Sequence, residues 1–346
     1  YKGVVIMATK SVRLEDVIVP ELFTSYDSEA FLTKNAFVST GVAVSDPRVT
    51  RLMDASEGGQ YINMPFWKVI ATDEPKIGSD DPNTKLELDK ITAGAELAVK
   101  GFYTKGFSAM SIAGILAGSN PMTAINNYIN DYWTTDAQKK IINASIGICA
   151  DSITNHNSDL VADISTNTGA GSDPNVTAES IILARGLLGD YQSVVNTVAM
   201  HSVVYTNLQT QQLIEFVRDA DNNTLFPTFN GMRVVVDDGM PTVAAGDKTA
   251  YYTFLYGPGV FGLNYGYVDR PQEVDRDPAS GNGTGEEKLY SRRSILVHPR
   301  GYKVADSLIS NTHLGLTYAE FAAGSTWTRV ISDRKAIPFV AIKSLG

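Results

Sequence analysis

The residues best suited to bind a phosphate-bearing ligand form a glycine pattern late in the chain. Gly257-Pro258-Gly259-Val260-Phe261-Gly262 has the GxGxxG spacing of dinucleotide-binding sites. That spacing holds a pyrophosphate only where it opens a helix, because the free N–H groups of the helix N-terminus bind the anion. The residues that follow, 263–267, are not a helical sequence. We therefore interpret this pattern as a turn between two strands.

Metal-binding patterns in the chain are incomplete. The run that starts at Asp219-Ala220-Asp221-Asn222-Asn223 is similar to the beginning of a calcium loop. Its sixth position is Thr224, where glycine is needed, and its twelfth is Asn230 in place of a bidentate glutamate. A polar turn is the better interpretation. The four histidines do not stand at metal-ligand spacing, and they are His156, His201, His298 and His313.

Nucleophile motifs are also missing from the sequence. There is no GxSxG elbow and no GxxxxGK[ST] phosphate loop. Cys149 is the single cysteine and lies in an apolar helical pattern, so we expect a small buried side chain. One cysteine excludes a disulfide within the chain and a zinc cluster built from thiolates. The sequence therefore predicts no catalytic residue, no cofactor and no metal.

Composition and charge narrow the class of protein further. The 346 residues are 43% hydrophobic and 19% charged, which is typical of a globular protein of one elaborate domain or two ordinary ones. A net charge of −9 repels polyphosphate, so a dedicated nucleic-acid reader is disfavoured. No apolar stretch reaches the ~20 residues that cross a bilayer, and no signal peptide is visible. We expect a soluble protein made in a cytoplasm, without a membrane partner.

The first third of the chain predicts two extended features. Residues 1–45 show no sustained period, which indicates an arm held by its neighbours. A strand at Gln60–Ile70, an acidic turn-rich stretch at 72–82 and a returning strand at Lys85–Tyr103 predict a protruding hairpin. A lone two-stranded ribbon is marginal in water, so the hairpin needs a partner surface.

The residues after the hairpin are expected to form both helices and strands. Asn120-Pro121 is a good helix start, and apolar residues at helical spacing predict a helix of roughly 50 Å up to about Ile153. A second helix is expected over Thr177–Leu188, closed by Gly189. Residues 194–218 fit either a strand followed by a helix or one longer helix. Further strands are expected at Met232–Asp237, Tyr251–Tyr267, Ser294–Val304 and Ala336–Lys343. The fold class is α+β, because no regular βαβ alternation appears.

In this order, the segments resemble the major capsid proteins of tailed bacteriophages, whose fold is shared with herpesviruses. The resemblance covers nearly the whole chain and is carried by Val17–Phe23, Met64–Trp67, Gly231–Pro241, Leu296–Gly301 and Arg334–Pro338. It implies an N-arm at 1–50, an extended E-loop at 51–105, and a P-domain spine helix at 106–155. It further implies an A-domain at 156–275 and P-domain return strands at 276–346.

The resemblance also implies a function and partners. Pentamers and hexamers of the chain would close into an icosahedral shell around phage DNA, assembled in the host cytoplasm, with no enzymatic activity. Implied partners are further copies of the chain, portal and scaffolding proteins, a decoration protein where one exists, and packaged double-stranded DNA bound without sequence recognition. Two alternatives stay open: an encapsulin-like nanocompartment with protein cargo, and a β-rich enzyme or carbohydrate-binding module.

Assembly contacts are expected at the hairpin tip. Exposed carboxylates there repel one another, so the tip is easier to explain if it lies on a basic surface of another subunit. A solvated loop is the alternative. The expected interface residues are Trp67, Asp73, Glu74, Lys76, Asp80 and Asp81 on the hairpin, and Arg292, Arg293, Arg300 and Lys303 on the counter-surface.

Overall fold

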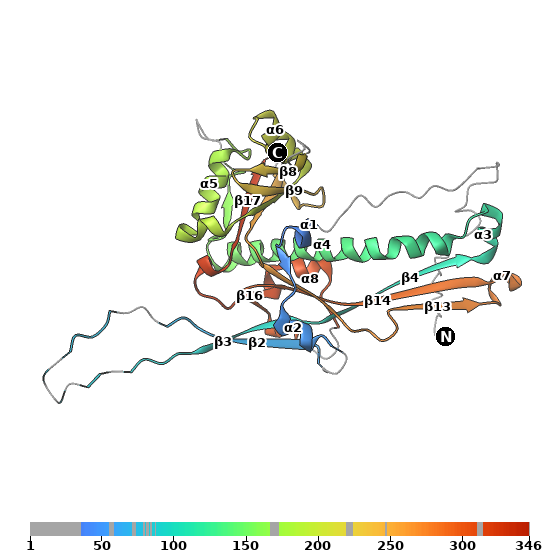
Figure 1. The fold of residues 1–346 in the computed structure, drawn as a ribbon, viewed down its shortest axis with the longest axis horizontal. Helices are drawn as coiled ribbons and strands as arrows, with labels where there is room; N and C mark the ends of the chain where they lie inside the picture. The colour runs from blue at the N-terminus through green and yellow to red at the C-terminus, as the bar shows by residue number, and fades with distance from the viewer. Residues whose placement is uncertain are drawn as a thin grey trace, which may run out of the picture.

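The computed structural model describes residues 36–54, 59–70, 74–78, 80, 83, 85–86, 88–166, 173–218, 224–245, 248–309 and 314–345. Most of the expected N-terminal arm, the calcium-like run Asp219–Asn223 and His313 lie outside these residues. The described part is α+β, as predicted (Figure 1). Its elements are α1 (Ala36–Ser39), β1 (Ala43–Val44), α2 (Pro47–Leu52), β2 (Tyr61–Trp67), β3 (Ala93–Val99), β4 (Gly101–Met110), α3 (Ser111–Ala117), α4 (Pro121–Asn155), β5 (Val161–Asp163), α5 (Ala178–Gly186), η2 (Gly189–Val194), β6 (Thr197–Met200), α6 (Ser202–Thr210), β7 (Glu215–Arg218), β8 (Thr224–Phe229), β9 (Met232–Val236), β10 (Thr242–Ala245), β11 (Lys248–Tyr256), β12 (Phe261–Gly266), β13 (Gln272–Asp277), α7 (Ser280–Gly283), β14 (Glu286–Pro299), β15 (Tyr302–Val304), η3 (Asp306–Leu308), α8 (Tyr318–Ala322), η4 (Gly324–Thr326), β16 (Trp327–Arg329), η5 (Arg334–Ala336) and β17 (Phe339–Leu345).

The long helix α4 is the central support of the subunit, and its prediction is confirmed. The Asn120 side chain caps it by accepting a hydrogen bond from the N–H of Met122 at 2.9 Å, and Pro121 takes the first position. The helix has 35 residues, which corresponds to about 52 Å. Its second half is buried on several faces, because the upper sheet packs on one side and α8 and η4 on another (Figure 1).

An elongated sheet, antiparallel except for the short pair of β1 with β12, runs beside the first half of α4 (Figure 1). Its central strand is β14, which pairs with β4 along one edge and with β13 and then β12 along the other. The glycine pattern at 257–262 forms the turn from β11 into β12, with Gly259 at φ 66°. This confirms its interpretation as a turn between strands. The expected strand at Ser294–Val304 is divided, because a turn at Gly301 (φ 84°) separates β14 from β15.

A second sheet forms the compact upper part of the subunit. Its strand order is β5-β17-β11-β6-β9-β8-β7, with β10 on β11, and α5 and α6 lie against it (Figure 1). The stretch at 194–218 contains β6, α6 and β7, so the alternative of a strand followed by a helix is the correct one. Helix α5 ends at Gly186, three residues before the expected closing Gly189, which has φ 59° and opens η2.

Strand pairing crosses the domain boundaries expected from the sequence. β12 falls in the segment 156–275 and β13 begins in it, yet both belong to the elongated sheet. β17 falls in the segment 276–346, yet it lies in the middle of the upper sheet between β5 and β11. The elongated sheet and the upper sheet are therefore connected by a chain that passes between them more than once.

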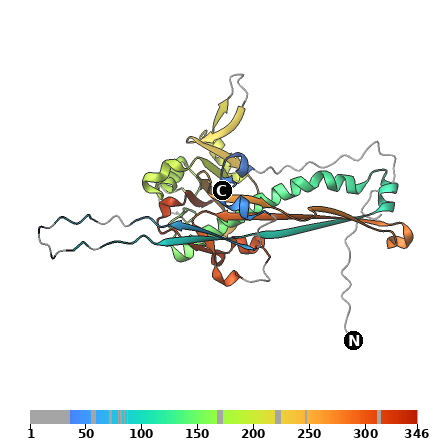
Figure 2. The ribbon, with the colours of Figure 1, turned by 60° about the horizontal axis from the view of Figure 1, so that its bottom comes forward.

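The hairpin β2–β3 extends away from the body on the side opposite to α3 and α7 (Figures 1 and 2). The expected returning strand at Lys85–Tyr103 is wrong in extent, because β3 begins only at Ala93 and Lys100 separates it from β4. The described residues between 68 and 92 have no strand assignment, since alternation alone cannot form a strand without a partner along its edge.

The main apolar core lies between α4 and the upper sheet, and a smaller cluster around Val49, Met64 and Leu296 anchors the base of the hairpin. Cys149 is buried in the main core as expected, and burial raises the pKa of its thiol. Trp133 and Trp327 are core residues. Among the helices that the structure describes, none is long and apolar enough to span a membrane.

Candidate assembly surface

The hairpin carries an unusual number of exposed apolar side chains. Trp67 is 70% exposed, Val69 93%, Ile77 93% and Leu88 87%. Glu74, Lys76 and Asp80 are exposed beside them, whereas Asp73 and Asp81 lie outside the described residues. Contiguous exposed apolar residues on a soluble subunit mark a protein–protein contact. We call the described residues among 67–91 the hairpin surface.

The four basic residues expected to form its counter-surface are distributed over different parts of the subunit. Arg292 and Arg293 are consecutive in β14, so their side chains point to opposite faces of the sheet. Arg292 donates to Glu273 at 3.0 Å and, through this hydrogen bond, lowers the pKa of that carboxyl. Arg293 donates to the amide oxygen of Asn130 on α4 at 3.3 Å.

The other two basic residues lie near the turn after β14. Lys303 forms an ion pair with Asp306 at 3.0 Å. Arg300 is exposed, and its side chain forms no ion pair or hydrogen bond within the described residues. One subunit therefore does not present the four residues as a single basic patch, and Arg300 is the member most available to a partner.

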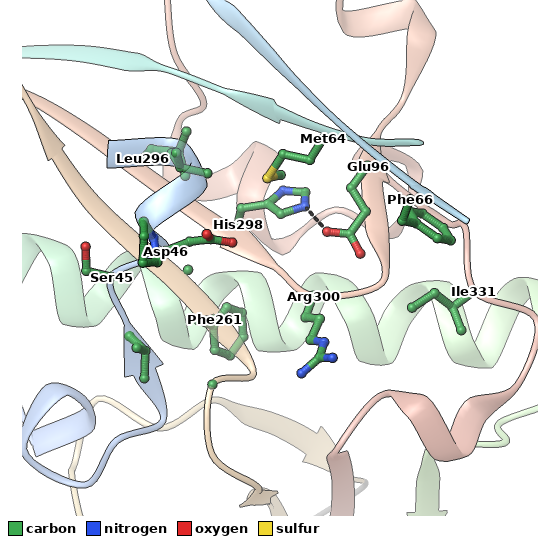
Figure 3. Close-up of a pocket in the computed structure, with 15 residues that line it drawn as sticks. Ser45, Asp46, Met64, Phe66, Glu96, Phe261, Leu296, His298, Arg300 and Ile331 are labelled. Atoms are coloured by element: carbon green, nitrogen blue, oxygen red, sulfur yellow. Dashed lines mark ion pairs between the residues drawn. The ribbon is translucent and has the colours of Figure 1, made fainter. Parts of the chain in front are cut away.

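Arg300 stands at a cavity of about 550 Å³ between the base of the hairpin and the end of β14 (Figure 3). The lining is mainly apolar: Val44, Pro47, Val49, Met64, Phe66, Phe261, Leu296 and Ile331. Ser45 and Asp46 lie on one side of it, Phe66 and Ile331 on the other, and His298 with Glu96 between them (Figure 3). The cavity combines apolar walls with a few polar groups, which is typical of a recognition site.

The polar wall of this cavity joins the hairpin to the body. Glu96 on β3 accepts a hydrogen bond from the N–H of Gly301 at 3.0 Å, and its second oxygen lies 3.6 Å from Nε2 of His298. His298 is 5% exposed, and neither ring nitrogen has a hydrogen-bond partner among the described residues. Its ring lies 6.4 Å from that of Trp327, centroid to centroid. His298 stands near the C-terminal end of β14, where this strand pairs with β12 along one edge and its pairing with β4 along the other has already ended at Ile295.

A second polar group is buried under α4. Lys140 is 2% exposed, pairs with Asp136 one turn earlier in the helix and lies 3.3 Å from the ring centre of Tyr103. The hydroxyl of Tyr318 donates to the other oxygen of Asp136. Burial lowers the pKa of Lys140. These groups satisfy one another, so the cluster connects α4, β4 and α8 and does not constitute a reactive centre.

Sequence reasoning missed both buried polar groups. Glu96 stands in the alternating run of a strand, and Lys140 stands between apolar residues at helical spacing. A charged residue on the apolar face of a predicted element was the available signal, because such a residue is buried only when it is paired.

The described part of the chain contains no grouping of three or more histidine, cysteine or carboxylate side chains able to hold a metal ion. His156 lies 3.4 Å from Asp151, and His201 lies 3.8 Å from Asp238, in different parts of the fold. Each forms at most a local pair, so the histidines that the structure describes, His156, His201 and His298, do not meet in one site.

The comparisons with known proteins identify the class of this fold. The structure aligns with the capsid of Ralstonia phage GP4 over 94% of this chain and 96% of that chain, with a TM-score of 0.58 and 12% identity. It aligns with the cyanophage Pam1 capsid over 85% and 94%, with a TM-score of 0.56 and 12% identity. At these identities the likeness concerns the fold alone, which is that of tailed-phage capsid proteins.

Sequence comparison then gives the family. The profile of the Gp13-like family, described as major capsid protein 13-like, matches residues 48–340, and the chain belongs to this family. The chain is also 32% identical over 324 residues to the major capsid protein of Bacillus phage SPP1, which covers 93% of this chain and 95% of that protein. It is accordingly a major capsid protein of a tailed phage that forms the capsid shell of the virion, a structural protein and not an enzyme.

Proposed function

We propose that copies of this chain associate as pentamers and hexamers that close into an icosahedral shell around double-stranded phage DNA. The observation that carries this proposal is the hairpin surface, whose apolar side chains Trp67, Val69, Ile77 and Leu88 are exposed in the single subunit. A neighbouring subunit can cover them. The net charge of −9 suits a wall that encloses DNA without binding it tightly.

The expected division of the chain gives each part a role in this assembly. Residues 51–105, the E-loop, supply the hairpin, and residues 1–50 supply an N-arm. Helix α4 and the elongated sheet, within 106–155 and 276–346 together with β4, β12 and β13, form the P-domain. The rest of 156–275, completed by β17, forms the A-domain around the axis of each pentamer or hexamer. We further propose that portal and scaffolding proteins, and a decoration protein where one exists, join the shell during assembly in the host cytoplasm.

The hairpin surface has a proposed contact on the next subunit. Its acidic residues Glu74 and Asp80, with Asp73 and Asp81, would lie near basic side chains of the neighbour, of which Arg300 is exposed and has no ion pair within the described residues. Single exposed ion pairs contribute only ~0.2–1 kcal/mol. A shell repeats each contact many times, so small contributions per subunit decide whether it closes.

Assembly of the purified chain tests the proposal. Light scattering and negative-stain microscopy should show closed shells of uniform size. A species that stays at the subunit mass of 37.4 kDa at high concentration and every salt condition would contradict self-assembly.

A charge reversal tests the contact. Asp80→Lys with Asp81→Lys should impair assembly more at low salt than at high salt, because salt screens the new repulsion. Arg300→Glu in the same chain should restore part of the yield. Equal assembly of the double reversal and the parent at all ionic strengths would show that the tip is a solvated loop.

A further inference from the structure

A small polar cavity of about 280 Å³ lies between the first half of α4 and the part of the elongated sheet where β12 pairs with β14. It is lined by Asn130, Trp133 and Thr134 of α4, by Tyr265 of β12 and by Arg293 of β14. Among the described residues of this lining there is no carboxylate, and Arg293 supplies the single positive charge. One cation among neutral polar groups favours an anionic ligand over a cation or an apolar molecule.

The charge of Arg293 is not neutralised within the described part of the chain. The half-buried guanidinium donates to the amide oxygen of Asn130 at 3.3 Å, and this partner is neutral. Arg292, which points to the opposite face of the sheet, is instead paired with Glu273 at 3.0 Å. The chain has 38 acidic residues against 29 lysines and arginines, yet Arg293 meets none of the acidic groups. Its charge is therefore available to an anion from outside.

Two further hydrogen-bond donors stand beside the guanidinium. Asn130 uses its amide oxygen to accept from Arg293, which leaves its N–H groups to donate to a ligand. Burial raises the pKa of Tyr265 although Arg293 acts to lower it, so the hydroxyl keeps its proton and can donate. Asp136 also acts on Tyr265, but its carboxylate is already paired with Lys140. The donors thus surround one anion-sized space.

We propose that this cavity binds a phosphate group, with Arg293 as its main ligand and Asn130 and Tyr265 as hydrogen-bond donors. A guanidinium suits phosphate because two of its N–H groups can bind two oxygens of the anion in parallel. The group can belong to inorganic phosphate or to the backbone of a nucleic acid. The nucleic-acid source rests on the proposed enclosure of DNA, whereas binding of inorganic phosphate does not.

The tryptophans provide a local test in the unmodified chain. Trp133 lines the cavity and its indole N–H donates to Ser291 at 2.9 Å, whereas Trp67 lies on the hairpin. The indole signals of an isotope-labelled chain are assigned by NMR with Trp67→Phe and Trp133→Phe. Inorganic phosphate, added to the unassembled chain at constant ionic strength, should shift the Trp133 signal saturably and leave the Trp67 signal unmoved. A Trp133 signal that phosphate does not shift would overturn the proposal.

Substitution of the arginine tests its role as the main ligand. Arg293→Gln should weaken phosphate binding, followed by the same signal, by about fivefold or more. Arg292→Gln is the matched control, because this neighbour in β14 faces away from the cavity and is already paired with Glu273. The affinity of the control should stay within about twofold of the parent. Equal affinities in Arg293→Gln and the parent would contradict the proposal.

A substitution on the exposed face of α4 decides the matter if Arg293→Gln fails to fold. Asn130→Asp places a carboxylate against Arg293 and should weaken phosphate binding by about fivefold or more. Asn126→Asp is its control, since it adds the same charge one turn earlier at an exposed position outside the lining. Both variants should keep the urea midpoint of the parent. Equal phosphate affinities in the two variants would refute the site.

Binding of a short mixed-sequence DNA duplex to the unassembled chain distinguishes the two sources of phosphate. Each phosphate that a protein neutralises contributes about 0.9 to the slope of log affinity against log salt concentration. Arg293→Gln should reduce the magnitude of this slope by about that amount, and Arg292→Gln should leave it unchanged. An unchanged slope in Arg293→Gln, or no measurable DNA binding, would overturn the nucleic-acid source and assign the site to inorganic phosphate. Each of these measurements uses unassembled chains, so a failure to form shells is a separate outcome.

Discussion

Replacing Gly147 by alanine should destabilise the subunit, although alanine is the better helix former. Gly147 lies in the second half of α4, where η4 and α8 cross the helix closely. A Cβ atom at this position would lie 2.3 Å from the carbonyl oxygen of Phe321 and 2.5 Å from Nε1 of Trp327. Real Cβ contacts are not that short, so backbone and ring would both have to move.

Two opposing effects set the size of the loss. Alanine in place of glycine stabilises a helix interior by about 1 kcal/mol. Against this, forcing extra volume into a packed core costs about 1–3 kcal/mol. The displaced indole of Trp327 would also lose its 2.9 Å hydrogen bond to Phe321, which contributes about 0.5–1.5 kcal/mol. The expected net loss in the free energy of unfolding is about 0.5–3.5 kcal/mol.

Urea unfolding of the unassembled subunit, followed by near-UV circular dichroism of the tryptophans, measures this change. Gly186→Ala is the matched control, because Gly186 ends α5 and a Cβ there meets no atom within 4 Å. The control should unfold at the parental midpoint or slightly above it. If Gly147→Ala proves as stable as the parent, the close crossing of α4 by α8 and η4 does not require a glycine at this position.

Three further predictions follow from other parts of the fold. Asp136→Ala should reduce the free energy of unfolding by about 3–5 kcal/mol, since it leaves Lys140 buried without its carboxylate. The double variant Asp136→Leu with Lys140→Met should lose less of this free energy. Equal losses in the two variants would contradict the role of Asp136 as the partner of Lys140. Burial raises the pKa of Tyr256, so the stability that it contributes is complete below about pH 10 and falls by up to ~1.4 kcal/mol per pH unit above that. Tyr256→Phe should make the urea midpoint less dependent on pH between pH 9 and 11. An unchanged pH dependence would show that Tyr256 does not cause the loss of stability at alkaline pH. Trp67→Ser should change subunit stability by less than ~0.5 kcal/mol but lower the yield of shells in microscopy, because the side chain is exposed in the subunit.

Elements defined by local signals could be predicted from the sequence. Asn120 and Pro121 fixed the start of α4 because capping and the first-turn geometry depend on neighbouring residues only. The glycine turn at 257–262 was recognisable because a nucleotide site requires a helix directly after it. The returning strand was overextended, since a strand exists only where another strand pairs with it. The described residues just before Ala93 have one backbone hydrogen bond across the hairpin, from Lys68 to Thr92, and no strand pairing.

The candidate site depends on long-range pairing and could be predicted only in part. The exposed, charged hairpin followed from composition and from the turn signals on either side. The Glu96–His298 wall did not, because it joins residues about 200 positions apart through the packing of β3 on the end of β14. The four basic residues were grouped because they are near in sequence, but alternation along β14 sends Arg292 and Arg293 to opposite faces.

The contrast between α4 and the hairpin determines how a shell wall would respond to mechanical load. A helix of 35 residues, packed along the elongated sheet and under the upper sheet, resists bending as one stiff beam. Beyond Trp67 and Ala93 the described residues of the hairpin form no strands, so we expect this part to bend first. Elastic compliance in a shell of such subunits therefore resides in the joints that the hairpins make, while each body moves as a rigid plate.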